Sequence, residues 1–341
     1  MPAPHSFATS STSPVRDTLE RLFRGQTLSR DEAHRLMDGV LDEAVPAEQV
    51  SALAACLRMR LPTVHELAGF RESVWARASH VELDARDAID MVGTGGDGLD
   101  TFNITTLSAL TVAACGVRVV KHGNGSASSK HGSSDTLRAA GLGFRQNEDD
   151  LRRQLDAAGI TFLHAPLFHP VLGRVAALRK RLGVGTFFNL LGPLLNPASP
   201  GLAYIGVADA ATQGLYDELF RGFAKAHLIV HSNDGYDEAT LTGPVRCYSA
   251  RGRRTLQARD FGLPPCTGAE IVSEADALAQ FRRIVAGEGT AAETNNVAAN
   301  AGLALQLADQ HREALPVYTA RARERLLGGH VKTTFDKLLA A

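Results

Sequence analysis

Three short stretches carry the residue types that could do chemistry. The first reads DMVGTGGDGLDTFNITT from Asp90 to Thr106, the second KHGNGSASSKHGSSD from Lys121 to Asp135, and the third DGYDE from Asp234 to Glu238. Glycine-rich turns expose backbone N–H groups, and the hydroxyl and lysine side chains beside them suit a bound phosphate. Neighbouring carboxylates suit Mg²⁺. Together the stretches indicate a site for a phosphorylated ligand and a divalent metal.

The first stretch reads as the end of a strand, a glycine turn and the start of a helix. This arrangement gathers free backbone N–H groups and the positive end of a helix dipole at one point. Glycine lets the backbone approach an anion closely, because it has no Cβ. Five donors stand nearby, namely Thr94, Thr101, Asn103, Thr105 and Thr106. Taken alone, the stretch is equally compatible with an ordinary tight strand-to-helix turn.

The second stretch repeats this pattern after the next expected strand. Its charges come from Lys121 and Lys130 and its hydroxyl donors from Ser126, Ser128, Ser129 and Ser133. A single serine-rich loop is usually a solvated connection, and so is a single acidic pair. Two such loops at the carboxyl ends of adjacent strands converge on one crevice. Opposite that crevice, we interpret Asp237 and Glu238 as metal ligands.

The elements that must position these stretches fall into two units. From residue 14 to about 80 the apolar spacing is helical, and S/T-x-x-E capping boxes at Ser29 and Thr63 mark helix starts. We expect a small all-helical N-terminal domain there. Residues 81–341 alternate short β-branched runs with helices, which predicts a larger α/β domain with a mostly parallel central sheet. The segment 169–197 is apolar and helical, and we expect part of it to join the helical domain. Residues 1–13 read as a flexible tail.

The expected strands and helices of the larger domain can be placed along the chain. The strands are 88–92, 117–120, 161–164, 203–207 and 227–231. The helices are 105–115, 134–140, 149–158, 211–224, 275–286, 293–308 and 316–327.

Composition excludes several classes of protein. The 341 residues carry a net charge of -1, so no global positive field attracts nucleic acid. No apolar run approaches the roughly 20 residues that a membrane helix needs. The four cysteines are far apart and form no CxxC pair, which is typical of reduced thiols in the cytoplasm.

The stretches together resemble the anthranilate phosphoribosyltransferase family of tryptophan biosynthesis, from the first helices to the C-terminus. The matching motifs are GTGGD at 93–97, the TFN stretch at 101–106, KHGN at 121–124, HP at 169–170, LR at 178–179, FFNLLGPLLNP at 187–197, DGYDE at 234–238 and LTGP at 241–244. The combination is far more specific than any single motif.

The resemblance implies an enzyme that joins anthranilate to 5-phosphoribosyl 1-diphosphate, giving N-(5-phosphoribosyl)anthranilate and pyrophosphate. It also implies Mg²⁺ as cofactor and a homodimer formed through the helical domain. The implied phosphoribosyl diphosphate site is Gly93, Gly96, Asp97, Thr101, Asn103, Ile104, Thr105, Thr106, Lys121, His122, Gly123, Asn124, Ser126, Ser128, Ser129 and Ser133.

The remaining implied roles divide between metal, catalysis and the second substrate. The metal ligands would be Thr105, Asp237 and Glu238. The catalytic residues would be Asp237, Glu238 and His122. The anthranilate contacts would be Gly93, Asn124, His169, Arg179 and Pro193. The chemistry agrees, because an aromatic amine needs no strong base, whereas its carboxylate needs a cation such as the planar fork of arginine.

Several of these residues also have simpler interpretations. Arg179 lies among equally basic neighbours on a helix face that could be solvated. His169 could only cap a helix before a proline, and His122 could be a core histidine. The chain also departs from the family pattern, with Gly125 and Gly185 where arginines are usual, Thr105 in place of serine, and His131 in place of a small residue. His131 or Lys130 could replace part of the missing charge.

Two other functions remain open from the sequence. One is a pyrimidine-nucleoside phosphorylase of the same general fold, against which the KHGN and FNLLGPLLNP motifs and the DGYDE pair argue. The other is a non-catalytic nucleic-acid-binding relative, against which the retained glycine loops and the near-neutral charge argue.

Overall fold

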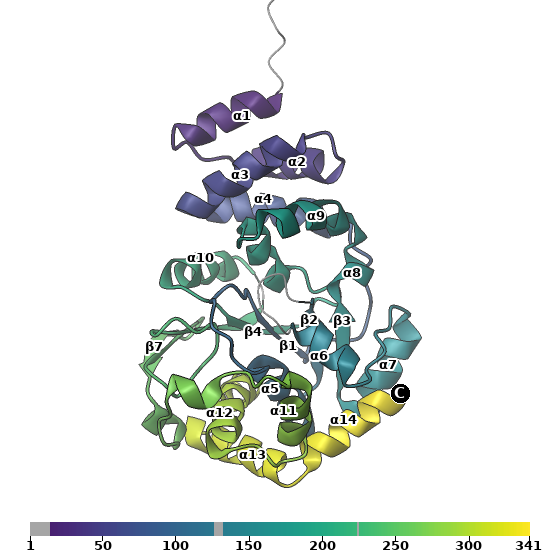
Figure 1. The fold of residues 1–341 in the computed structure, drawn as a ribbon, viewed down its shortest axis with the longest axis vertical. Coiled ribbons are helices and arrows are strands. Elements are labelled where there is room, and N and C mark those ends of the chain that lie inside the picture. Colours follow the sequence, from purple (N-terminus) through teal and green to yellow (C-terminus); the bar gives the residue numbers. More distant parts are fainter. Residues whose placement is uncertain (1–13, 126–131, 224) are drawn as a thin grey trace, which may run out of the picture.

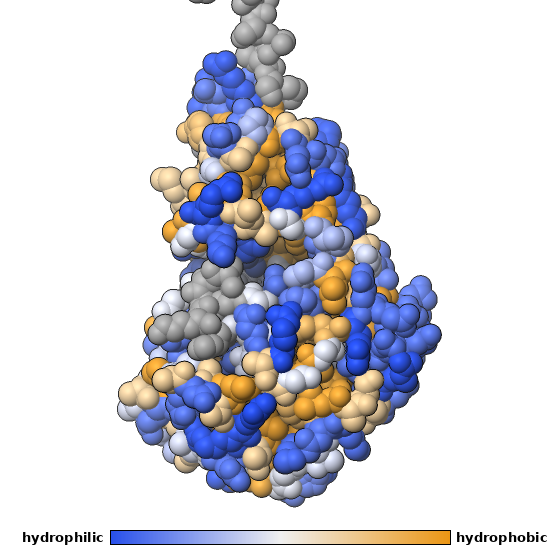
Figure 2. Space-filling view, turned by 45° about the vertical axis from the view of Figure 1, so that its right-hand side comes forward, coloured by the Kyte–Doolittle hydropathy of each residue, from blue (hydrophilic) through white to orange (hydrophobic). Residues whose placement is uncertain are grey.

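The computed structural model describes residues 14–125, 132–223 and 225–341. Figure 1 shows a stack of N-terminal helices above a larger body built on a twisted sheet. In the space-filling view the outline is narrow over the helices and broad over the body (Figure 2). This confirms the expected fold class, a small helical part and a larger α/β part. None of the helices in the described residues is long and apolar enough to cross a membrane.

Four helices form the N-terminal part. They are α1 (Pro14–Phe23), α2 (Arg30–Leu41), α3 (Ala47–Arg60) and α4 (Val64–Trp75). Both predicted capping boxes are present, at the starts of α2 and α4. Glu66 of the second box is fully buried, and its carboxylate also accepts hydrogen bonds from the backbone N–H of Leu28 and from Arg60. This one side chain therefore ties together the start of α4, the end of α3 and the turn before α2.

The sheet has seven strands in the order β3-β2-β1-β4-β5-β6-β7. The five predicted strands are parallel to one another, and they are β1 (Ile89–Gly93), β2 (Val119–Gly123), β3 (Ile160–His164), β4 (Leu202–Gly206) and β5 (Ala226–Ser232). Two further strands, β6 (Val245–Ser249) and β7 (Gly252–Leu256), pair antiparallel at the edge beside β5. The sequence analysis missed these strands, because an arginine-rich hairpin on a sheet edge lacks the apolar alternation of a half-buried strand.

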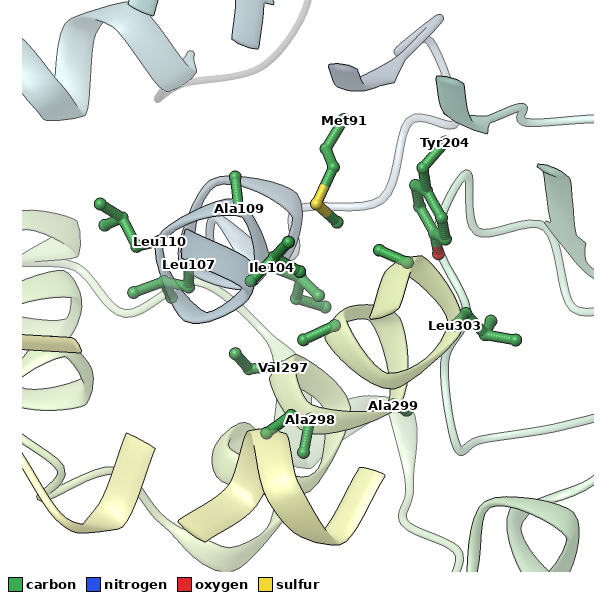
Figure 3. Close-up of a cluster of buried hydrophobic side chains, with 14 of the residues drawn as sticks. Met91, Ile104, Leu107, Ala109, Leu110, Tyr204, Val297, Ala298, Ala299 and Leu303 are labelled. Atoms are coloured by element: carbon green, nitrogen blue, oxygen red, sulfur yellow. The ribbon is translucent and has the colours of Figure 1, made fainter. Parts of the chain in front are cut away.

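The helices of the α/β part lie around this sheet, except for α9 (Gly173–Leu182), which packs against α3. The bounds of the others are α5 (Ile104–Ala114), α6 (Ser133–Ala139), α7 (Glu148–Ala158), α8 (Ala165–Phe168), α10 (Ala210–Arg221), α11 (Ala277–Val285), α12 (Ala291–Ala308), α13 (Leu315–Leu327) and α14 (His330–Ala340). Helix α12 is buried from Ala292 to Leu307 and packs beside α5 under the sheet (Figure 3). Helix α14 was not predicted. It packs against α5 and α7.

The segment between α8 and β4 packs toward the N-terminal helices. It contains the 3-10 helices η1 (Pro170–Leu172) and η2 (Phe187–Leu194) as well as α9. Its apolar side chains share one hydrophobic cluster with α1 to α4, and the Phe187 ring lies 5.0 Å from that of Phe70. The same cluster continues onto β4, β5 and α10. The segment therefore lies between the N-terminal helices and the sheet.

Candidate active site

The three chemical stretches line one cavity of about 650 Å³ at the carboxyl ends of β1, β2 and β5. Residues of α9 and η2 form its opposite wall. The predicted residues found in the lining are Gly93, Gly96, Asp97, Thr101, Asn103, Thr105, Thr106, Lys121, His122, Gly123, Asn124, Ser133, His169, Arg179, Asp237 and Glu238. The convergence expected of the two glycine loops is therefore present in the structure.

The glycines of the first loop serve two different purposes. A Cβ on Gly93 would lie 2.7 Å from Oδ2 of Asp237, so this glycine makes room for a carboxylate of the same chain. Gly95 and Gly96 have open space around them, and their φ angles of +62° and +86° are of the left-handed kind that glycine adopts without strain. The sequence analysis attributed the glycines to close approach of an anion. In the structure Gly93 lies against Asp237, and the open space beside Gly95 and Gly96 is compatible with the predicted approach of an anion.

Glu238 lies at the amino end of α5. Its Oε1 accepts hydrogen bonds from the backbone N–H of Thr105, at 2.8 Å, and from the Thr105 hydroxyl, at 2.7 Å. Asp237 accepts a hydrogen bond of 3.0 Å from the backbone N–H of Gly95. Both carboxylates therefore accept hydrogen bonds from the first glycine-rich stretch, at Gly95 and Thr105. These bonds link the acidic stretch to the first glycine-rich stretch.

Glu238 is buried and the neighbouring Asp237 is half-buried. Burial, followed by the charge of Asp97, raises the pKa of Asp237 to about 7. Burial and the charge of Asp237 raise the pKa of Glu238 to about 8. Oε2 of Glu238 is buried and has no hydrogen-bond partner. An environment of this kind favours either protonation or a bound cation.

The donor set fits Mg²⁺. A buried, unpartnered carboxylate oxygen beside a second carboxylate and the Thr105 hydroxyl gives hard oxygen ligands. Within the described residues, no group of three or more His, Cys, Asp and Glu side chains forms a complete metal cage. Mg²⁺ commonly takes one or two carboxylates and completes its shell with water and phosphate oxygens.

Lys121 and Asp90 form a buried polar pair behind the second loop. The Lys121 ammonium donates to the backbone carbonyl of Met91. Burial lowers the pKa of Lys121, while Asp90 and Glu238 raise it in part. Oδ1 of Asp90 accepts a hydrogen bond of 3.0 Å from the backbone N–H of His122. Asp90 was not predicted as a site residue, although a lone carboxylate inside the apolar strand AIDMV could have suggested it.

The His122 and His169 rings lie side by side with their centroids 5.3 Å apart and their planes at 72° to each other. Nδ1 of His122 contacts the carbonyl of Gly192 at 3.2 Å, and Nε2 of His169 contacts that of Leu195 at 2.7 Å. A carbonyl only accepts hydrogen bonds, so these ring nitrogens carry the protons. Burial lowers the pKa of His122 to about 3 and that of His169 to about 4. Nε2 of His122 and Nδ1 of His169 are therefore bare acceptors, and both are buried without a partner.

Arg179 is the member of its basic run that lines the cavity. Lys180 and Arg181 are exposed and do not line it, and Arg174 lies near Asp42 and Glu43. The Arg179 guanidinium donates to Oδ1 of Asn189 at 3.4 Å and lies 5.8 Å from the centre of the Phe188 ring. Burial lowers its pKa. Of the basic residues on α9, Arg179 therefore lines the cavity.

Other predicted residues lie elsewhere. The Ile104 side chain is buried in the core beneath the sheet, and Pro193 is buried in η2 without lining the cavity. Ser126, Ser128, Ser129, Lys130 and His131 lie outside the described residues. A Cβ on Gly125 would lie 3.1 Å from the Asp135 carboxylate, and Gly185 has open space around it. The sequence analysis also missed Asn189, which lines the cavity beside Arg179.

Known proteins are similar to this chain in sequence and in fold. The family model "Glycosyl transferase family, helical bundle domain" matches residues 16–78, and "Glycosyl transferase family, a/b domain" matches residues 85–330. The anthranilate phosphoribosyltransferase of Christiangramia forsetii is 38% identical over 327 residues, covering 95% of this chain and 98% of that protein. The crystal structure of the enzyme from Thermus thermophilus superposes with a TM-score of 0.87 at 32% identity, covering 95% of this chain and 98% of that one.

A Saccharomyces cerevisiae enzyme solved with phosphoribosyl diphosphate and Mg has the same fold, with a TM-score of 0.87 at 23% identity over 97% of this chain and 98% of that one. The similarity to the bacterial proteins covers nearly the whole chain, and so both parts of the molecule and the walls of the cavity. The chain therefore belongs to the anthranilate phosphoribosyltransferase family.

Proposed function

We propose that this protein transfers the phosphoribosyl group of 5-phosphoribosyl 1-diphosphate to the amine of anthranilate, releasing pyrophosphate, as a step of tryptophan biosynthesis. One observation carries the proposal. A single cavity brings together a glycine-rich turn at the start of α5, the carboxylates of Asp237 and Glu238, and the guanidinium of Arg179. These three features match a polyphosphate, its metal and an aromatic carboxylate, respectively.

The phosphoribosyl diphosphate would lie between the two glycine loops. The first loop offers backbone N–H groups and the hydroxyls of Thr101 and Thr106, and the second offers Asn124 and Ser133. Asp237, Glu238 and the Thr105 hydroxyl would hold Mg²⁺, which would neutralise charge on the departing diphosphate. The wall already contains four carboxylate side chains, those of Asp97, Asp100, Asp237 and Glu238, so the described residues alone provide little positive charge for this group. The metal site is therefore central to binding this substrate.

Anthranilate would enter from the side of α9 and η2. The Arg179 guanidinium would bind the anthranilate carboxylate, since it lies in the wall and has no carboxylate partner among the described residues. Nε2 of His122 would accept a hydrogen bond from the amine, because it is a bare nitrogen without a partner. This contact would orient the amine nitrogen toward the anomeric carbon. Because burial lowers the pKa of His122 to about 3, the proton that the amine loses as the C–N bond forms would pass to the departing diphosphate.

The reaction is followed by the loss of anthranilate fluorescence in the presence of phosphoribosyl diphosphate and Mg²⁺. We expect turnover that needs all three components. A parallel reaction with inorganic phosphate and a pyrimidine nucleoside tests for phosphorylase activity, and salt-dependent DNA binding tests for a non-catalytic relative. Phosphorolysis or DNA binding without consumption of anthranilate would refute the proposal.

We also propose a homodimer formed through the N-terminal helices, and the cytoplasm as its compartment. The side chains of Phe23 and Met59 are 61% and 90% exposed on this part, which supports an interface there. All four cysteines are free thiols, as suits a reducing compartment. Light scattering of the wild type and of Phe23→Asp with Met59→Asp tests the dimer. A dimer unaffected by both changes would refute this interface.

A further inference from the structure

The backbone that follows the two carboxylates is buried without forming a regular element. Ala239 and Thr240 are fully buried, and Leu241 is almost so. A buried segment outside helices and sheets must find hydrogen-bond partners for its N–H and C=O groups, because each unpaired group costs stability. In this segment side chains supply several of these partners, some from α12, which is distant in sequence, and one from the nearby end of β5.

Asparagines of α12 bind the main chain on one side. Oδ1 of Asn300 accepts from the N–H of Ala239 at 2.9 Å, and its Nδ2 donates to the carbonyl of Ala239 at 2.9 Å. One helical turn earlier, Oδ1 of Asn296 accepts from the N–H of Leu241 at 2.9 Å. Both asparagines are fully buried. The two amides thus hold Ala239 at both of its polar groups and Leu241 at its N–H.

Neighbouring elements fix the asparagines and close the other side of the segment. The Tyr204 hydroxyl donates to Oδ1 of Asn300 at 2.5 Å, and Figure 3 shows the Tyr204 ring directed from β4 toward α12. Nδ2 of Asn300 also donates to the carbonyl of Asn296 at 2.8 Å. On the β5 side, the Ser232 hydroxyl donates to the carbonyl of Glu238 at 2.7 Å and accepts from the N–H of Thr240. Together these contacts leave the segment little freedom to shift.

We propose that Asn300 and Asn296 are positioning residues for the metal-binding carboxylates, and that α12 sets where Asp237 and Glu238 stand in the cavity. Two buried carboxylates repel each other when charged, and a free loop would separate them. The hydrogen bonds that the two asparagine side chains make with Ala239 and Leu241 hold the two carboxylates together before the metal binds. The inference rests on the proposed function, since it presumes that these carboxylates hold Mg²⁺ with phosphoribosyl diphosphate.

The test compares Asn300→Ala with a matched control on the same helix. Asn295 is also a buried asparagine of α12, but its Oδ1 accepts from Arg323 at 3.1 Å, on a different side of the helix from the carboxylate segment. Asn295→Ala therefore deletes a buried amide without touching that segment. Calorimetric binding of phosphoribosyl diphosphate, titrated over Mg²⁺ concentration, is the readout, and thermal unfolding reports the structural cost of each variant.

We expect Asn300→Ala to raise the Mg²⁺ concentration for half-maximal binding by on the order of 10-fold, and Asn295→Ala by less than about twofold. The anthranilate KM of both variants should stay close to wild type. Should Asn300→Ala fail to fold, Asn296→Ala, which loses the bond to Leu241, takes its place in the same comparison with a smaller shift in the same direction. Equal Mg²⁺ dependence in the Asn300→Ala variant and the Asn295→Ala control would overturn the positioning role. Binding by the wild type that ignores Mg²⁺ would instead refute the metal site itself.

Discussion

Replacing Glu238 by glutamine tests the buried carboxylates most directly. Glutamine keeps an oxygen that can accept the two hydrogen bonds from Thr105, but it carries no charge. In the metal-free protein the buried charge of Glu238 opposes folding, and the charge of Asp237 adds to the effect. We therefore expect Glu238→Gln to stabilise the metal-free protein while it abolishes most of the activity.

The magnitude follows from the pKa. The pKa of Glu238 rises from 4.5 to about 8, and each pKa unit corresponds to about 1.4 kcal/mol. Because the repulsion is shared with Asp237, we expect a gain in the free energy of unfolding on the order of 2 to 4 kcal/mol at pH 9. The folded protein binds the extra proton between about pH 4.5 and 8, so this contribution to wild-type stability is present at low pH and is lost as the pH rises through 8.

The assay is urea unfolding of both proteins in EDTA at pH 5, 7 and 9. At pH 5 the wild-type carboxyl is protonated, so the two proteins should be nearly equal in stability, and the variant should gain on the wild type at each higher pH. Excess Mg²⁺ with phosphoribosyl diphosphate should stabilise only the wild type, and turnover of the variant should fall by on the order of 10² or more. A variant no more stable than wild type at pH 9 would show that the charge of Glu238 is not buried as described.

Three further changes test other parts of the structure. Arg179→Ala should raise the anthranilate KM at least about 10-fold with little change in the KM of phosphoribosyl diphosphate; if both constants rise together in steady-state kinetics, Arg179 is not the carboxylate partner. Gly93→Ala places a methyl group 2.7 Å from the Asp237 carboxylate, so turnover should fall about 10-fold or more at a nearly unchanged melting temperature, and normal turnover would contradict the close approach. Glu66→Ala leaves Arg60 without its buried partner and should cost about 3 kcal/mol in denaturant unfolding; a loss below about 1 kcal/mol would show that this ion pair is not structurally important.

Much of the fold could be predicted because its signals are local. The capping boxes at Ser29 and Thr63 involve residues three positions apart, and both are present where the pattern predicted them. The five parallel strands were recognisable as short apolar runs. The β6–β7 hairpin was not, because its stability comes from pairing with β5 and its own residues are largely polar. Helix α14 was also missed, and it is held by packing against α5 and α7.

The sequence by itself determined which residue types are available for phosphate, metal and carboxylate binding, and that two glycine loops follow adjacent strands. Only the tertiary structure decided why Gly93 must be glycine, since its neighbour Asp237 belongs to a different strand connection. It alone decided which nitrogens of His122 and His169 are bare, because the carbonyls that bind the other nitrogens lie in and just after η2. It also brought Asn300 onto the backbone beside Glu238. Each of these contacts joins residues far apart along the chain, and only close packing of the folded core brings such residues within hydrogen-bond distance.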